Sequence, residues 1–273
     1  MATMNVDAWL QLLADELRRH GIAQAQARTV LGDVSTHLHD SGEDPYRAFG
    51  PPERYAAAVA ESLLRPPTLG RPVGPVRLDA RGISKRFGRR QVLRDATLTV
   101  RSGQIAAIVG ANGSGKTTLL RICAGLLRPD TGTVTVDGQC SYAPQDGGTV
   151  PFLRPDEHFA LVGAGRGLSR GEAREQGRAW AATLGWRDIG DEPARLLSGG
   201  TRQKLNLVLS TLTGADVLLL DEPYQGFDRG AYVNLWEQLW RLRDAGTAIV
   251  VVTHLLNHLD QADLVLDLTE VPA

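Results

Sequence analysis

The sequence predicts an α/β protein with a largely parallel sheet, and three observations support this prediction. Apolar runs of strand length occur at 104–109, 217–220, 248–252 and 264–268, and such runs suit strands that are buried on both faces. Segments with helical spacing of apolar residues lie between them. A stretch rich in Pro and Gly, PPTLGRPVGP at 66–75, separates this pattern from an entirely helical N-terminal part.

The N-terminal part, residues 1–65, is predicted to be a small all-α module of three helices. Apolar side chains recur there at helical spacing in three stretches. They are Trp9, Leu10, Leu13 and Leu17; Val30, Leu31, Val34 and Leu38; and Tyr55, Ala56, Val59, Ala60 and Leu63. With 66–75 as a linker, residues 76–273 form the α/β domain.

The first part of the α/β domain is expected to form short strands at 76–87, 91–100 and 104–109. A helix is predicted over 116–127, and GTVTVDG at 132–138 is expected to be one arm of a hairpin. The pattern from about 153 to 213 is mostly helical. Strands and helices then alternate, which favours a parallel sheet with helices on both faces.

Composition narrows the class of protein. The 273 residues are 42% hydrophobic, which is enough for one sizeable core and a small second module. Lys and Arg number 30 and Asp and Glu number 31, so the charge balance does not point to nucleic acid or an anionic membrane as the main partner. Two cysteines exclude a disulfide framework, and neither a signal-peptide core nor a run of about 20 apolar residues occurs. We therefore expect a cytoplasmic chain that does not itself cross a membrane.

The stretch GANGSGKTTLL at 110–120 lies between an apolar strand and a helical segment. Gly110, Gly115, Lys116 and Thr117 fill the fixed positions of the pattern G-x-x-x-x-G-K-[ST]. Glycines let backbone N–H groups turn inward around phosphate oxygens, Lys116 adds a positive charge, and the following helix presents its positive end. Thr117 can place its hydroxyl on Mg²⁺. A glycine-rich turn that binds nothing would not need Lys and Thr at these positions.

Two carboxylates end the apolar strand in DVLLLDEP at 216–223. Asp221 is suited to hold the water shell of Mg²⁺, and Glu222 is suited to orient or deprotonate an attacking water. Acids at the end of a buried strand are unfavourable unless they have a function.

A second anion site is expected in LLSGGTRQKLNLVLS, residues 196–210. Ser198, Gly199 and Gly200 open a helix whose first N–H groups and hydroxyl point outward. One chain therefore carries two phosphate-binding ends, and two chains facing head to tail could hold ATP between them. Taken alone, Ser-Gly-Gly is better interpreted as an ordinary helix cap.

Together, these motifs make residues 76–273 resemble the ATP-binding subunits of ABC transporters, in the motif order of that family. The resemblance implies a P-loop NTPase fold with a RecA-like core, an antiparallel β subdomain and a helical subdomain. The matching positions are Gly110 to Thr118 for the Walker A loop, including Asn112, Gly113 and Ser114; Gln145 for the Q-loop; Leu197 to Gly200 for the signature; Asp221 and Glu222 for Walker B; Asp228 for the D-loop; His254 for the switch; and Phe87 for the aromatic that stacks on adenine.

The resemblance also implies a role for each position. Mg²⁺ would be held by Thr117, Gln145 and Asp221, and catalysis would involve Glu222 with Gln145, Asp228 and His254. ATP would contact Phe87, the loop residues through Thr118 and, from an opposing chain, Ser198, Gly199 and Gly200. The chemistry of the side chains agrees, because an amide oxygen can bind Mg²⁺ and a flat apolar ring can stack on a purine. Taken singly, Phe87 would be core, Gln145 a turn residue and His254 a satisfied strand-end histidine.

The same resemblance implies partners and location. A second cassette, identical or different, would complete the composite sites, and a separate membrane permease would contact residues from Gln145 to about 165. The subunit would lie on the cytoplasmic face of the membrane through that permease, with no nucleic acid as partner. The lack of a long extension after residue 273 resembles exporter-type subunits.

The helical module carries a second resemblance. SGEDPYRAFGPPERYA at 41–56 is similar to HAAS-type modules, which accompany bacterial membrane-protein systems, at Phe49-Gly50, Pro52 and Tyr55-Ala56. The alternative is that Gly50-Pro51-Pro52 simply turns the chain into the third helix.

Several positions depart from the ABC pattern. Thr201 replaces the usual Gln, and Tyr224, Gln225 and Phe227 replace small residues and Leu. The acids and glycines are intact, so an active ATPase is expected. A soluble ABC-type ATPase acting on ribosomes or DNA is the alternative, although such proteins have two cassettes or a long coiled coil. A P-loop kinase would lack the Ser-Gly-Gly helix start.

Overall fold

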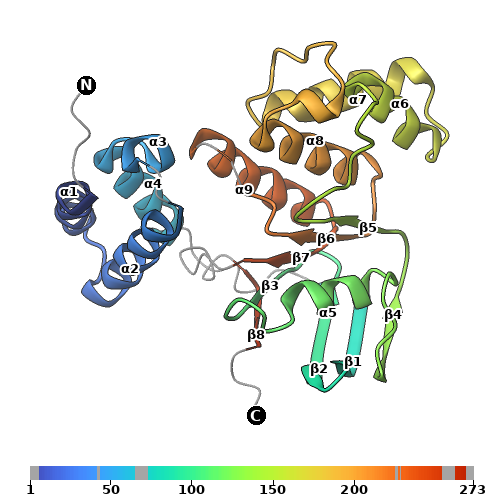
Figure 1. Ribbon diagram of the computed structural model, residues 1–273, viewed down its shortest axis with the longest axis horizontal. Coiled ribbons are helices and arrows are strands. Elements are labelled where there is room, and N and C mark those ends of the chain that lie inside the picture. Colours follow the sequence, from blue (N-terminus) through green and yellow to red (C-terminus); the bar gives the residue numbers. More distant parts are fainter. Residues whose placement is uncertain are drawn as a thin grey trace. The chain divides into compact units, whose positions relative to one another are not determined.

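The computed structural model describes residues 6–41, 44–64, 73–224, 227, 229–253 and 262–268. The chain divides into two compact units. One contains the N-terminal helices α1–α4, and the other contains all the strands together with α5–α9 (Figure 1).

The smaller unit is built from α1 (Val6–Arg19), α2 (Gln24–Ser41), α3 (Pro45–Phe49) and α4 (Pro52–Leu64). The apolar stripe of α1 is buried in its core, where Trp9 donates from Nε1 to Gly50 O at 2.9 Å. The three predicted helices are present, and the structure adds the short α3. Asp44 explains it, because its side chain accepts from the N–H of Tyr46 at 3.0 Å and Pro45 occupies the first helical position.

The predicted linker lies largely outside the described residues, so the domain boundary stays a prediction. Its last residues belong to the larger unit. Gly74 N–H donates to Ser102 O, and Ser102 N–H donates to Pro75 O at 2.9 Å.

The larger unit contains an antiparallel sheet in the order β2-β1-β4. Its strands are β1 (Val76–Phe87), β2 (Arg90–Arg101) and β4 (Thr131–Val136). The segment predicted as a hairpin arm pairs with β1, which is more than 40 residues earlier in the sequence, so Leu78 lies opposite Val136. A tight turn joins β1 to β2 and places Phe87 opposite Arg90.

The second sheet is parallel throughout its five strands, in the order β5-β6-β7-β3-β8. The strands are β3 (Ile105–Val109), β5 (Cys140–Ala143), β6 (Val217–Asp221), β7 (Ala248–Val252) and β8 (Leu264–Asp267). All residues of β3, β6 and β7 are buried, including neighbours that point to opposite faces. The prediction of a parallel sheet covered on both faces is confirmed.

Helix α5 (Lys116–Cys123) contacts strands of both sheets and so joins them (Figure 1). It ends four residues before the predicted end. Gly125 adopts φ 72°, its N–H donates to Ile122 O, and the next N–H, that of Leu126, donates to Arg121 O. This is a Schellman ending, which a left-handed glycine permits.

The remaining helices are α6 (Pro155–Ala164), α7 (Arg170–Thr183), the 3₁₀ turn η1 (Ala194–Leu196), α8 (Gly199–Leu212) and α9 (Arg229–Asp244). Helices α6, α7 and α8 pack on one another and form the helical subdomain (Figure 1). Helix α8 also contacts β5, and α9 contacts β7. Within the described residues, no helix combines the length and the apolar character that a membrane span requires.

Candidate functional site

The phosphate loop leaves the carboxyl end of β3, between β7 and β8, and runs into α5. Gly110, Gly113 and Gly115 all have positive φ, at 144°, 81° and 101°. A Cβ at Gly115 would lie 2.7 Å from the carbonyl oxygen of Val92, so this position accepts no side chain without displacing β2. Glycine is therefore required both for the conformation and for the close approach.

The polar groups of the loop fit a phosphate ligand. Lys116 is buried, and its Nζ donates to Gly110 O at 2.7 Å and Ala111 O at 3.1 Å. Within the described residues no carboxylate lies within ion-pair distance of this ammonium, although its charge partly offsets the effect of burial, which raises the pKa of Asp221. Ser114 Oγ is buried without a hydrogen-bond partner. A buried cation and an unpaired buried hydroxyl are both unfavourable unless an anion can satisfy them.

The other predicted loop residues surround this centre. Asn112 and Gly113 are exposed, and Thr118 is half-buried in the first turn of α5. Arg90, at the start of β2, donates from its guanidinium to Gly113 O at 3.1 Å. The sequence analysis missed Arg90, because it reaches the loop only through the packing of β2 against the start of α5, where Gly115 approaches Val92 closely.

The acids at the end of β6 lie beside the loop. Asp221 is fully buried, and its carboxylate accepts from Thr117 Oγ1 at 3.1 Å and from Tyr142 OH at 3.2 Å. Glu222 accepts from Gln145 Nε2 at 3.2 Å. The structure thus brings together Thr117, Gln145, Asp221 and Glu222 from three separate segments.

Tyr142 is a further residue that the sequence analysis missed. It lies in β5, which pairs with β6 so that Tyr142 is opposite Leu219. Burial, together with the charge of Asp221 and the hydrogen bond to it, raises the pKa of Tyr142, so its hydroxyl stays protonated and donates to that carboxylate. Its signal in the sequence was only its place three residues before Gln145.

Burial also raises the pKa of Asp221, and this effect outweighs the hydrogen bonds from Thr117 and Tyr142 that lower it. The folded protein therefore binds a proton at this carboxyl more tightly than the unfolded chain does. Protonated Asp221 therefore stabilises the folded protein relative to the unfolded chain. This stabilisation is fully present below the unfolded pKa, about 3.9, and it is lost as the pH rises through the raised pKa of the folded protein. At neutral pH the ionised carboxylate opposes folding.

We therefore expect Asp221→Asn to raise the melting temperature of the metal-free, nucleotide-free protein by about 2–4 °C at pH 8, because it removes an ionised group from a buried position. The gain should shrink as the pH is lowered toward 5. Thermal melts in EDTA across this range measure it, with Asp146→Asn, an exposed acid nearby, as control. An equal loss of stability at every pH would contradict the argument.

The remaining predicted residues are placed as follows. Phe87, at the end of β1, is 51% exposed, and Lys85 Nζ lies 5.8 Å from its ring centroid. Ser198 caps α8 by accepting from Thr201 N–H at 3.2 Å, Gly199 is exposed and Gly200 is half-buried. Asp228 and His254 lie outside the described residues.

The donor set fits Mg²⁺ bound with a nucleotide. Thr117, Gln145 and Asp221 offer a hydroxyl, an amide and one carboxylate, which suits an ion that keeps water and phosphate oxygens among its ligands. In the described part of the chain, no group of three or more His, Cys, Asp or Glu residues could hold a metal ion.

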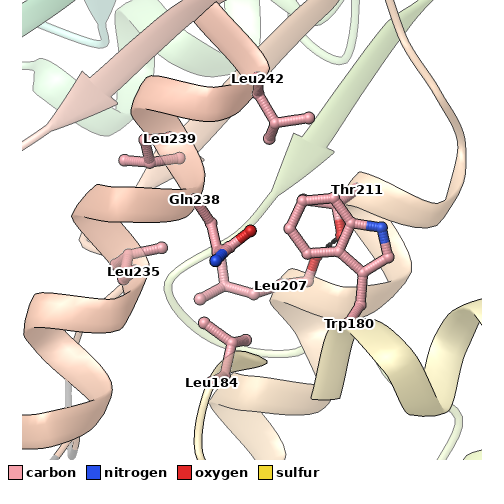
Figure 2. Close-up of a pocket in the computed structure, with 8 residues that line it drawn as sticks. All are labelled: Trp180, Leu184, Leu207, Thr211, Leu235, Gln238, Leu239 and Leu242. Carbon is pink, nitrogen blue, oxygen red and sulfur yellow. Dashed lines mark hydrogen bonds between the residues drawn. The ribbon is translucent and has the colours of Figure 1, made fainter. Parts of the chain in front are cut away.

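An apolar hollow between α7, α8 and α9 is a weaker candidate site. Figure 2 shows Gln238 reaching into it from α9, among leucines and the ring of Trp180. Its lining includes no ionisable side chain, and the Thr211 hydroxyl already donates to Leu207 O at 3.0 Å. A binding pocket usually has several polar groups that converge on a ligand, so the phosphate loop remains the stronger candidate site.

Comparison with known proteins agrees with this geometry. Residues 93–225 match the ABC transporter family. Over 220 residues the chain is 38% identical to the aliphatic sulfonates import ATP-binding protein SsuB of Cupriavidus pinatubonensis, covering 75% of this chain and 71% of that protein. The chain belongs to the ABC transporter ATP-binding proteins.

This ABC transporter ATP-binding protein is also 33% identical over 209 residues to the Nod factor export ATP-binding protein I of Ralstonia nicotianae, covering 72% of this chain. It spans 65% of the length of that relative. A solved ATP-binding subunit of an ABC transporter has a TM-score of 0.66 and 25% identity, covering 71% of this chain and 86% of its own. A dimeric bacterial ABC transporter cassette, at 21% identity, has the same TM-score and covers 70% of this chain and 94% of its own. The predicted P-loop NTPase fold is confirmed, while the HAAS-type resemblance stays a prediction.

Proposed function

We propose that this cassette hydrolyses Mg²⁺-ATP and that two cassettes together drive a separate membrane permease. The observation that carries the proposal is the meeting of Thr117 with Asp221 and of Gln145 with Glu222 beside the phosphate loop. These contacts join the residues that would hold the metal to the carboxylate that would act as base.

In the proposed reaction, Lys116 and the loop amides bind the phosphate chain and neutralise its charge. Mg²⁺ held by Thr117, Gln145 and Asp221 would supply positive charge that stabilises the charge of the phosphates. Water attacks the γ-phosphorus, the bond from that phosphorus to the β–γ bridging oxygen breaks, and ADP leaves with the electron pair. Glu222 accepts the proton of the water. Gln145 fixes the direction of this carboxylate through its amide.

Ser198, Gly199 and Gly200 of an opposing cassette would bind the γ-phosphate. Support comes from their position at the exposed N-terminus of a 14-residue helix, where backbone N–H groups favour an anion. Asp228 and His254 are proposed to assist at this composite site, and Phe87 to stack on the adenine.

The permease is proposed to dock on the turn that precedes α6. Phe152 lies on this turn and is 75% exposed, and Arg195 stacks over its ring at 5.7 Å. The turn is held firmly, because Val150 N–H donates to His158 Nε2 at 2.8 Å and Arg195 N–H donates to Pro151 O at 2.9 Å. An exposed aromatic on a fixed turn suits an apolar partner.

This docking places the chain at the inner face of the membrane through its permease. The relatives belong to both export and import systems, so the exporter-type assignment stays a prediction.

The decisive experiment is affinity isolation of the tagged chain from native membranes. We expect a multi-helix permease to accompany it, whereas recovery of ribosomes or DNA instead would contradict the proposal and favour the soluble alternative.

We further expect Phe152→Ala to reduce recovery of the permease about tenfold or more, since burying a Phe side chain contributes about 1.5–3 kcal/mol. ATP binding should be unchanged. The matched control is Leu126→Ala, which removes another exposed side chain, 60% exposed, after α5. Equal recovery with both variants would show that the turn is not the docking surface.

A further inference from the structure

The backbone of Glu222 is strained. Its φ is 46°, and among the described residues only Asp95 is another non-glycine residue with positive φ. Such a conformation is unfavourable for a residue with a Cβ, and it persists only where the surroundings over-determine it. Contacts of the neighbouring residues must therefore maintain the left-handed conformation of Glu222.

Two contacts join residues 222–224 to the end of β7. The N–H of Glu222 donates to Val252 O at 3.2 Å. Two residues later, the hydroxyl of Tyr224 lies 2.7 Å from Thr253 Oγ1, in a hydrogen bond that either atom can donate. The first contact holds the backbone of Glu222 against β7. The second holds the turn two residues further on, so the path of the chain after Glu222 is restrained as well.

The second contact is well placed to resist movement. Tyr224 is 7% exposed and Thr253 2% exposed, and a buried hydroxyl that loses its partner is strongly unfavourable. Thr253 is itself held, because its N–H donates to Ile108 O at 3.1 Å in β3. These hydrogen bonds therefore connect β3, which leads into the phosphate loop, through Thr253 to the turn that carries Glu222.

We propose that Tyr224, through its hydrogen bond to Thr253, is a positioning residue that keeps Glu222 in its left-handed conformation and so aims its carboxylate. The proposal rests on the proposed function, in which Glu222 takes the proton of the attacking water. It also gives a role to a position where the sequence departs from the family pattern, since a smaller residue at 224 would not span the distance to Thr253.

The test is a double-mutant cycle on steady-state ATP hydrolysis with Tyr224→Phe, Thr253→Val and the double variant. Each single variant should lower kcat about tenfold with KM for ATP within about twofold. The double variant should be no slower than the slower single variant, because all three lack the same hydrogen bond. Thr253→Ser, which keeps the hydroxyl, should retain most of the wild-type kcat.

Tyr46→Phe, which removes an exposed hydroxyl in the helical unit, is the matched control and should be silent. Wild-type kcat in Tyr224→Phe would overturn the proposal, as would additive losses in the double variant or a rise in KM equal to the fall in kcat. If Tyr224→Phe fails to fold, the comparison of Thr253→Val with Thr253→Ser tests the same hydrogen bond from its other end, and equal kcat in these two variants would overturn the proposal.

The Glu222→Gln variant distinguishes the positioning role of Tyr224 from the proposed catalytic role of Glu222. If Glu222→Gln is inactive while Tyr224→Phe is fully active, only the positioning role fails. If Glu222→Gln itself turns over at the wild-type rate, the catalytic assignment of Glu222 fails as well.

Discussion

Replacing Lys116 by alanine is expected to abolish ATP hydrolysis and to weaken nucleotide binding about 100-fold or more. The ammonium is held at the loop by two neutral carbonyl oxygens, those of Gly110 and Ala111, so it can turn to phosphate without breaking an ion pair. A hydrogen bond to a charged group contributes about 1.5–3 kcal/mol, and a phosphate group left without its cation adds a further penalty. Titration with a fluorescent ATP analogue and an assay of phosphate release measure the two effects.

Arg121→Ala is the matched control for Lys116→Ala. It removes the same charge from the last turn of the same helix, where Arg121 is exposed. Nucleotide binding should be close to wild type in this variant. Normal turnover in a folded Lys116→Ala protein would show that the loop does not bind the phosphates of ATP.

The second large effect is expected for Glu222→Gln, which should trap two cassettes around ATP. Glutamine keeps an oxygen that can accept from Gln145, whose amide lies 3.2 Å from Glu222 Oε2, but it cannot take the proton of water. ATP should then bind and persist, because hydrolysis no longer removes the γ-phosphate that joins the two chains. ADP lacks that phosphate and should not hold the pair together.

Size-exclusion chromatography with light scattering tests this prediction on Glu222→Gln with Mg²⁺-free ATP and then with ADP. Adding Ser198→Arg should prevent the ATP-dependent pair, since it places bulk and charge at the exposed start of α8. The same comparison should then be repeated in the complex with the proposed permease. If ATP and ADP give the same state there, and Ser198→Arg leaves hydrolysis unchanged, the head-to-tail arrangement is wrong.

Structural features that depend on residues close together in the chain were predictable from the sequence. The strand, loop and helix around residues 104–123 follow from an apolar run, glycines at fixed spacing and a helical stripe. The two acids at 221 and 222 were candidates from residue type, and the family resemblance implied that Asp221 shares a Mg²⁺ with Thr117; the hydrogen bond between these side chains brings them together. The error at the end of α5 was local, because Gly125 ends the helix after Cys123.

Contacts between distant segments were not predictable in the same way. Tyr142 meets Asp221 because β5 lies next to β6, although the two residues are 79 positions apart. Arg90 reaches Gly113 because β2 packs against α5 and the loop that precedes it. Hydrophobic periodicity tells which face of a strand is buried but not which strand lies beside it.

The amino-acid sequence by itself determined the family, the phosphate loop and the candidate acids, because each depends on residue type at fixed short spacing. The tertiary structure decided the strand order β5-β6-β7-β3-β8, the pairing of β4 with β1 and the left-handed conformation of Glu222. These features depend on which buried surfaces and hydrogen-bonding groups find one another across the chain, as when Thr253, at the end of β7, meets Tyr224 beyond β6. Such pairings are selected by the packing of the whole domain rather than by any local pattern.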